Sequence, residues 1–243
     1  WNAPMAAPAT LYIRNTNGSV EVKPAKGGNV EITADMKWRR GNPKHDITFQ
    51  TVPSGNGMLV CAVWNDGTCT PDKYETKKPG FTIGPFKQGS DASVNFTVYV
   101  PTGVKVDVMT MNGSIGAAMT APVKARTING TIRIATSVGP VDAETVNGDV
   151  DVRMTTLSGD GPVRARAITG SVAAYLPQQF DGSVEMESSL GSVVSDFAGT
   201  APADGNKKFT AVLGTGTHTV DIGTVTGSAA LHKLKPDGTV AAP

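Results

Sequence analysis

The chain has 243 residues, and its 22 Lys and Arg against 21 Asp and Glu give a formal net charge of +1. This balance argues against a general nucleic-acid binder, which carries a basic excess, and the apolar runs fall short of the roughly 18 residues that a membrane span requires. Only 6% of the residues are aromatic and 28 are glycine, which favours a β protein with many tight turns over a helical one.

Residues 1–9, WNAPMAAPA, form an apolar, uncharged tail that is broken by prolines. A first residue Trp1 in place of Met is typical of a mature N-terminus left by removal of a signal peptide. Three interpretations of the tail stay open: a disordered linker, a local cap, or an arm that reaches an adjacent subunit. In the third case Trp1 is the candidate assembly contact, because an exposed indole usually finds an apolar pocket.

Residues 10–103 are predicted to form a broad, sheet-like N-terminal part. The segment LYIRNTNGSVEV around Gly18 alternates apolar and polar residues, and further candidate strands lie at 45–52, 58–64 and 93–100. These strands are separated by polar loops rich in proline and glycine, and they break the repeat that follows. We expect them to extend the same stack rather than to form an independent domain.

Two cysteines, Cys61 and Cys69, flank the turn signal Asn65-Asp66-Gly67. Two short strands joined by that turn would bring them together as a hairpin, and a disulfide is the favoured interpretation over two free buried thiols or a catalytic thiol. A zinc site needs three or four ligands, and no histidine lies close in sequence. A disulfide indicates an oxidising compartment, hence a secreted or cell-surface protein.

Residues 104–231 carry an internal repeat of the form apolar-x-apolar-x-Thr-x-Asn-Gly-x-apolar-x-apolar. Successive copies read VDVMTMNGSIGA, VKARTINGTIRI, VDAETVNGDVDV, VRARAITGSVAA, VEMESSLGSVVS and VDIGTVTGSAAL. Including the early copy, the marker glycines are Gly18, Gly113, Gly130, Gly148, Gly170, Gly191 and Gly227. Gly216 falls inside the long last gap and is taken as one more marker. Each marker is predicted to be a sharp corner between two strands, with positive φ at Gly130 and Gly148.

The polar positions of the repeat carry charges whose sign reverses from copy to copy. Six residues before the marker stand Asp107, Lys124, Asp142, Arg164 and Glu185, and four residues before it stand Arg126, Glu144, Arg166 and Glu187. If equivalent strands stack in register about 4.8 Å apart, each charge lies between opposite charges. A β-sandwich, the alternative, does not explain this reversal. The sequence therefore predicts an all-β fold, a β-solenoid of stacked coils of 17–22 residues.

The units TxNGxI/V, preceded by a strand that ends in Val-Pro within FTVYVPTGVKVDVMTMNGSI, resemble the bacterial putative-adhesin family. The likeness runs from Leu11 to about Leu231. It implies a β-solenoid domain of unknown function on a secreted or envelope protein, with surface interaction as its role and no catalytic residues to carry over. The cysteine pair and the N-terminal tail lie outside the repeat, and the resemblance implies nothing about them.

The sequence holds no recognisable catalytic or cofactor motif. His45, His218 and His232 are scattered, and no nucleophile elbow, zinc-protease helix or phosphate loop is present. A carbohydrate-active β-helix enzyme would need acidic residues clustered on one outer face, and Asp142, Glu144, Asp149 and Asp151 come closest. We predict no metal and no cofactor.

Residues 232–243 are read as a C-terminal cap, because Lys233, Lys235 and Pro236 discourage further strand pairing. The leading hypothesis for function is a non-enzymatic, extracellular structural or adhesin-like solenoid that presents its faces to a surface carbohydrate or protein. The second hypothesis is a homo-oligomer, the subunit of a filament or surface layer joined head to tail through its N-terminal segment. The carbohydrate-active enzyme is the third.

Overall fold

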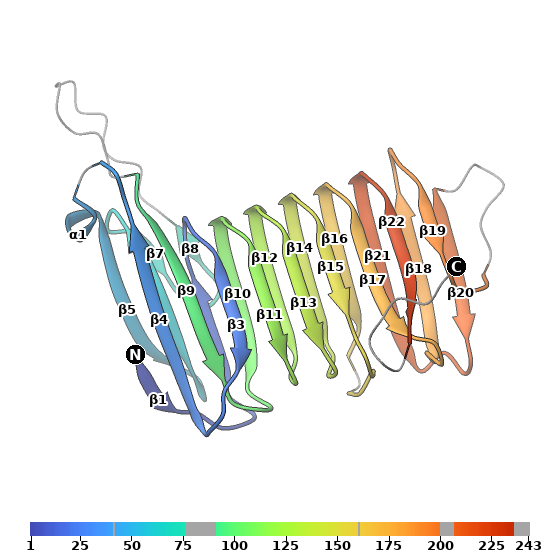
Figure 1. The fold of residues 1–243 in the computed structure, drawn as a ribbon, viewed down its shortest axis with the longest axis horizontal. Helices are drawn as coiled ribbons and strands as arrows, with labels where there is room; N and C mark the ends of the chain where they lie inside the picture. The colour runs from blue at the N-terminus through green and yellow to red at the C-terminus, as the bar shows by residue number, and fades with distance from the viewer. Residues whose placement is uncertain (41, 76–90, 160, 200–206, 236–243) are drawn as a thin grey trace.

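The computed structural model describes residues 1–40, 42–75, 91–159, 161–199 and 207–235. Two ten-stranded sheets face each other along a flat, elongated stack (Figure 1). Sheet A contains, in spatial order, β1 (Asn2–Pro4), β4 (Asn29–Lys37), β9 (Ser93–Val100), β3 (Val20–Pro24), β11 (Ile115–Met119), β13 (Ile132–Thr136), β15 (Val150–Arg153), β17 (Val172–Pro177), β22 (Ala229–Leu234) and β19 (Val193–Ser195). Sheet B contains β20 (Lys208–Leu213), β18 (Gly182–Ser188), β21 (His218–Thr226), β16 (Val163–Thr169), β14 (Val141–Asn147), β12 (Val123–Asn129), β10 (Lys105–Asn112), β2 (Thr10–Arg14), β6 (Gly57–Trp64) and β5 (Ile47–Ser54).

Each repeat copy supplies one strand to each sheet, and the marker glycine lies at the corner between them. Equivalent strands pair in parallel and in register, so that Val106, Val123, Val141 and Val163 follow one another across sheet B. Their side chains point inward and are almost fully buried. The apolar faces of the two sheets thus form one continuous core, and the predicted all-β solenoid with in-register coils is confirmed.

The corners require glycine for its lack of a side chain as well as for its dihedral freedom. Gly148 has φ +146°, as predicted, whereas Gly130 lies outside the positive-φ range, so that prediction is wrong. At both positions an added Cβ would overlap a backbone carbonyl of the preceding coil, that of Gly130 for Gly148 and that of Gly113 for Gly130. Close approach of neighbouring backbones, rather than the dihedral angle alone, excludes a side chain here.

The threonine of the TxNG unit has a structural role at the same corner. Its side chain points into the core and its hydroxyl donates to the carbonyl of the preceding marker glycine, as Thr127 does to Gly113 and Thr145 to Gly130, each at 3.0 Å. The asparagines form a second ladder outside, in which the amide of Asn129 donates to Asn112 at 2.8 Å. The threonines supply the donor that a buried carbonyl needs. Both ladders link each corner to the next.

Replacing Thr145 by valine is expected to destabilise the fold by about 1–3 kcal/mol, because the carbonyl of Gly130 then loses its hydroxyl donor inside the core. Thr145→Ser keeps the hydroxyl and is the matched control. Ser188 already makes the equivalent bond, to Gly227 at 2.7 Å. Urea unfolding of the two variants measures the difference, and equal midpoints would show that the hydroxyl contributes nothing.

The C-terminal coils do not stack in the order of the sequence. The coil formed by β21 and β22 inserts between the coil of β16 and β17 and that of β18 and β19. The marker Gly227 therefore lies beside Gly170, and Gly191 lies beyond it. The assignment of Gly216 as a further marker is wrong, because β20 runs antiparallel to β18 at the sheet edge and Gly216 belongs to the turn that follows.

The N-terminal part continues both sheets, since β2 pairs with β10 and β3 pairs with β11. Residues 47–54, 57–64 and 93–100 form strands close to the predicted ones, and a single helical turn, α1 (Pro43–Asp46), precedes β5. At this end the antiparallel strand β5 forms the edge of sheet B, and the antiparallel strands β4 and β1 complete sheet A. Of the predicted C-terminal cap, residues 232–234 belong to β22, and residues 236–243 lie outside the described part.

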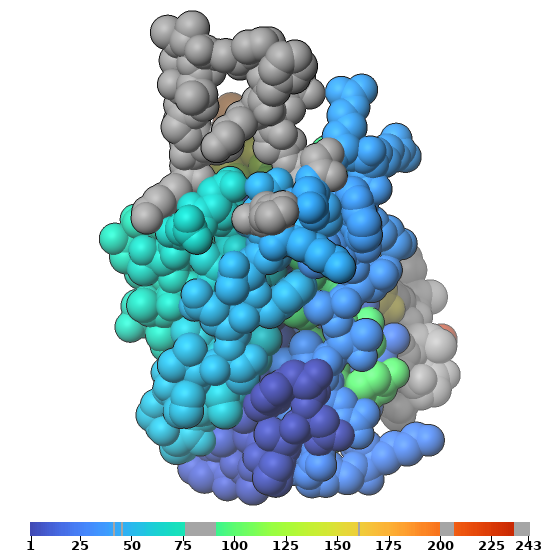
Figure 2. Space-filling model, turned by 90° about the vertical axis from the view of Figure 1, so that its left-hand side faces the viewer, coloured from blue at the N-terminus to red at the C-terminus, as the bar shows by residue number. Residues whose placement is uncertain are grey.

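The N-terminal tail begins with a strand, β1, that belongs to sheet A. β1 pairs antiparallel with β4, and the backbones of Trp1 and Ile32 exchange two hydrogen bonds of 2.9 and 2.8 Å. Figure 2, which looks onto the N-terminal end, shows this segment on the molecular surface. The first residues thus form an edge strand of sheet A, with the indole of Trp1 41% exposed.

Cys61 and Cys69 are joined by a disulfide, and Asn65 and Asp66 adopt the positive φ of a tight turn. The expected hairpin is not formed, because Cys61 lies in β6, which pairs with β2 and β5, whereas Cys69 lies in β7 (Thr68–Cys69), which pairs with β8 (Tyr74–Glu75). The disulfide instead fastens the loop of residues 65–75 to the outer face of sheet B, over a small apolar cluster around Leu59 and Val63.

Tyr74 anchors the far end of this loop. Its buried phenol donates to the carbonyl of Ala62 at 2.6 Å and lies 2.7 Å from the hydroxyl of Thr16. Burial raises the pKa of Tyr74 to about 12. The folded chain therefore keeps a proton that the unfolded chain loses near pH 10.

The free energy of unfolding is accordingly expected to decrease as the pH rises from about 10 towards 12, by about 2–3 kcal/mol in total for this group. Tyr74→Phe should remove this part of the pH dependence while lowering stability at neutral pH, because two hydrogen bonds are lost. Urea unfolding of both proteins at a series of alkaline pH values tests this, and parallel pH profiles would contradict it.

Candidate interaction face

The outer face of sheet B displays the charges predicted from the repeat. Along each strand three outward positions follow one another, six, four and two residues before the marker glycine, because side chains alternate across a sheet. We call this surface, over β10, β12, β14, β16, β21 and β18, the striped face. Its first charged row is Asp107, Lys124, Asp142, Arg164, Asp221 and Glu185, and its second row is Met109, Arg126, Glu144, Arg166, Gly223 and Glu187.

The charges form stripes along the strands. The outward positions six and four residues before the marker glycine are both basic in β12 and β16, and both are acidic in β14 and β18. The predicted register of the first four copies is confirmed. Arg164, however, neighbours Asp221 and not Glu185, because β21 inserts before β18.

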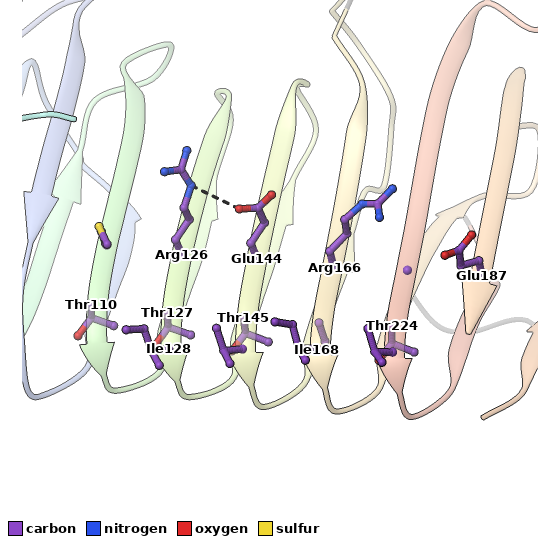
Figure 3. Close-up of a pocket in the computed structure, with 15 residues that line it drawn as sticks. Thr110, Arg126, Thr127, Ile128, Glu144, Thr145, Arg166, Ile168, Glu187 and Thr224 are labelled. Atoms are coloured by element: carbon purple, nitrogen blue, oxygen red, sulfur yellow. Dashed lines mark ion pairs between the residues drawn. The ribbon is translucent and has the colours of Figure 1, made fainter. Parts of the chain in front are cut away.

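Uncharged rows flank these stripes on both sides. The apolar row lies two residues before the marker glycines and consists of Ile128, Val146, Ile168 and Val225. The proline row lies at the start of the strands and consists of Pro122, Pro140 and Pro162. A shallow groove of about 430 Å³ runs between the second charged row and the apolar row, with backbone and threonines as its floor. Figure 3 shows Arg126, Glu144 and Arg166 along one side of this groove and Ile128 and Ile168 along the other. A second groove of about 420 Å³ runs between the first charged row and the proline row.

The ion pairs of the striped face differ in closeness. Lys124 lies 3.7 Å from Asp142 and Arg126 lies 3.6 Å from Glu144, distances longer than those of charge-assisted hydrogen bonds. Arg166, in contrast, contacts Asp221 at 2.6 Å, and this hydrogen bond raises the pKa of its guanidinium. The charged groups of β12 and β14 therefore keep more capacity for an external partner than Arg166 and Asp221 do.

At the two ends of the face, acidic residues are neutralised within the chain. The carboxylate of Asp107 forms an ion pair at 2.9 Å with the guanidinium of Arg14, whose side chain is 3% exposed. Glu185 lies 2.8 Å from Lys208, and this hydrogen bond raises the pKa of the Lys208 ammonium.

The carboxylates considered for catalysis do not come together. Asp142 and Glu144 lie on the outer face of sheet B, whereas Asp151 lies in β15 of sheet A beside Arg153, at 3.1 Å. Asp149 accepts the backbone N–H of Ser171 at 2.8 Å at the corner. The four carboxylates are thus divided among sheet B, the corner and sheet A, and only Asp142 and Glu144 share a face.

The histidines are also apart. His232 lies 3.2 Å from Asp196 and stacks against Tyr175, near the C-terminal end of sheet A, and His218 begins β21 in sheet B. The side chain of His45 lies outside the described part. Within the described ranges no three His, Cys, Asp or Glu side chains group as metal ligands, and those ranges include no helix with the length and hydropathy of a membrane span.

Comparison with known proteins places the chain in a family. The family model described as Toastrack DUF4097 matches residues 9–231, which confirms the resemblance drawn from the TxNGxI/V units. A solved structure described as a putative cell adhesion protein from Clostridium sporogenes ATCC 15579 is similar with a TM-score of 0.46 and 11% identity, over 95% of this chain and 97% of that chain. No curated protein matches. The chain belongs to the Toastrack (DUF4097) family.

Proposed function

We propose that this Toastrack domain is a non-catalytic, adhesin-like binding module outside the cell, and that the striped face is its binding surface. The observation that carries the proposal is the pair of long grooves across sheet B, walled by half-exposed charges on one side and by apolar side chains on the other. Exposed charged and apolar groups that converge on one concave surface are typical of binding sites. The disulfide between Cys61 and Cys69 fits an oxidising, extracellular location.

The ligand that suits these grooves is an extended surface carbohydrate or protein segment. Both grooves cross successive strands, so a bound chain would lie along the stack and meet the same pattern again at each coil. Such repetition favours many weak contacts over one deep pocket.

Binding of the labelled full chain to intact bacterial cells and to arrays of acidic and neutral polysaccharides tests the proposal. Ile168→Arg places a bulky charge in the apolar row at a side chain that is 51% exposed, and should reduce binding at least about tenfold by blocking the groove. Val194→Arg, at a 52% exposed position of β19 in sheet A, is the matched control. Equal binding by both variants would reject the striped face as the binding surface.

The head-to-tail filament is the second candidate, and Trp1 is its proposed contact. The side chain of Trp1 is 41% exposed at the N-terminal end, although its backbone is already paired with Ile32. Only the indole is thus available to a neighbouring subunit. Trp1→Ala should then shorten or abolish open-ended assemblies in sedimentation while monomers keep their shape, and unchanged profiles would reject this contact.

A further inference from the structure

We propose that the partner of the striped face is a second copy of the same chain, bound face to face about a two-fold axis that runs parallel to the strands between β14 and β16. This inference rests on the proposed function, because it takes the striped face as the binding surface and names its occupant. From β10 to β21 acidic and basic stripes alternate at the strand separation of about 4.8 Å, whereas β18 places Glu185 beside Asp221. A second striped sheet offers charges with this same period.

The charge signs select the direction of the axis. An axis along the stack would place every strand opposite its own copy and bring like charges together. An axis parallel to the strands reverses the order of the coils and keeps each row opposite the same row. When that axis lies between β14 and β16, Asp142 and Glu144 face the basic stripe formed by Arg164 and Arg166 in the second copy.

The remaining strands of the face also match in this register. β12 lies opposite β21, so that Lys124 meets Asp221. Arg126 lies over Gly223, beside the guanidinium of Arg166 in the second copy, whose charge is compensated by Asp221 at 2.6 Å. The outermost pair, β10 opposite β18, brings two acidic residues together, but Asp107 and Glu185 are each neutralised within their own chain, at 2.9 and 2.8 Å. No charge of the six strands is left facing an uncompensated like charge.

The uncharged rows reinforce the same arrangement. The rotation sets Val146 against Ile168 and Ile128 against Val225 across the axis, and it sets Pro140 against Pro162. Ile128, Ile168 and Val225 are 38, 51 and 45% exposed in the single chain, so their burial adds an apolar contribution.

The disulfide-closed loop limits where the second copy can lie. Residues 65–75 cover the outer face of β2 and β6, immediately beside β10. In the proposed register this loop lies opposite β20 and the space beyond the sheet edge. An axis one strand nearer the N-terminal end would press the loop onto β21 and β18 of the second copy.

The size of the contact sets its strength. Six strands about 4.8 Å apart and seven residues of each strand give a footprint of roughly 24 by 20 Å. This is below the roughly 800 Å² per partner of a standard stable interface, so we expect a weak, reversible dimer. Copies displayed together on a surface would still adhere through many such contacts.

A charge-swap experiment on the full chain tests the inference. Wild-type protein at low ionic strength should form dimers in sedimentation as its concentration rises towards about 1 mM, and salt should weaken them. The basic-for-acidic variant Asp142→Lys/Glu144→Lys and the acidic-for-basic variant Arg164→Glu/Arg166→Glu should each lose self-association at least about tenfold. Their equimolar mixture should regain it, because each altered stripe then faces an opposite one.

The control is Lys23→Glu/Arg133→Glu, which changes the net charge as Arg164→Glu/Arg166→Glu does, but at exposed positions of sheet A. If it associates with the Asp142→Lys/Glu144→Lys variant as well as the Arg164→Glu/Arg166→Glu variant does, the attraction is non-specific and the inference is wrong. Wild-type protein that stays monomeric would also overturn it. In that case loss of cell binding by Ile168→Arg would still support the striped face as a binding surface for a different partner. Retention of cell binding by Ile168→Arg would reject both the dimer and the striped face as a binding surface. Assemblies that grow beyond the dimer would reject the two-fold contact.

Discussion

Gly130→Ala is expected to lower the free energy of unfolding by about 3 kcal/mol or more. The added methyl group would overlap the carbonyl oxygen of Gly113 in the preceding coil. Overpacking usually costs about 1–3 kcal/mol, because side chains rotate out of the way. Here the obstacle is backbone that is held in register on both sides, so the strain can be relieved only by separating two coils.

Gly27→Ala is the matched control, because an added Cβ meets nothing within 4 Å there. Gly148→Ala should be at least as damaging as Gly130→Ala, since it combines the same overlap with a φ of +146°. Thermal and urea unfolding of the three variants provide the comparison. If Gly130→Ala unfolds like Gly27→Ala, close approach of the coils is not what requires glycine at the corner.

Arg14→Met is expected to destabilise the protein by about 3–5 kcal/mol. The guanidinium is almost fully buried, pairs with Asp107 at 2.9 Å, and donates to the carbonyls of Asp107 and of Pro71 in the disulfide-closed loop. Removing one partner of a buried pair leaves the other charge without compensation. The substitution also removes the hydrogen bond to Pro71, which leaves the disulfide and Tyr74 to hold the loop on the face of sheet B.

Two further variants separate these effects. Arg164→Met removes an arginine that is 48% exposed and 3.4 Å from Asp221, and it should cost only about 0–1 kcal/mol. Arg14→Met/Asp107→Asn should recover part of the lost stability, because no buried charge remains. A loss for Arg14→Met no larger than for Arg164→Met, measured by urea unfolding, would refute the role assigned to the buried pair.

The repeat made most of this fold predictable, because a two-residue period on both sides of a recurring Asn-Gly leaves few arrangements. The signs of Asp107, Lys124, Asp142 and Arg164 were sufficient to predict parallel, in-register stacking. The inward role of Thr127 and Thr145 has a signal in the sequence, because a threonine recurs three residues before the glycine at an inward position.

The insertion of β21 could not be obtained from the same reasoning. Arg164 requires an acidic neighbour, and both Glu185 in β18 and Asp221 in β21 meet that requirement. Charge alternation therefore accepts either order of the coils. The disulfide-closed loop was equally out of reach, because the turn at Asn65 and Asp66 occurs as predicted but leads the chain over the outer face of β6 rather than back along it. The stripes of the candidate face were visible in the sequence, whereas their grooves and their neutralised ends depend on contacts between distant segments.

The order of the C-terminal coils has a consequence for how the chain reaches its native state. β18 is synthesised before β21, at a time when β16 is the exposed end of the growing stack. Docking β18 directly onto β16 would align Val184 with Val163 and Glu185 with Arg164, which is an acceptable pairing by every local rule. Such a pairing would have to open again before the last coil could enter between the two strands. We therefore expect a kinetic trap late in folding, created by the same regularity that makes the rest of the stack easy to assemble.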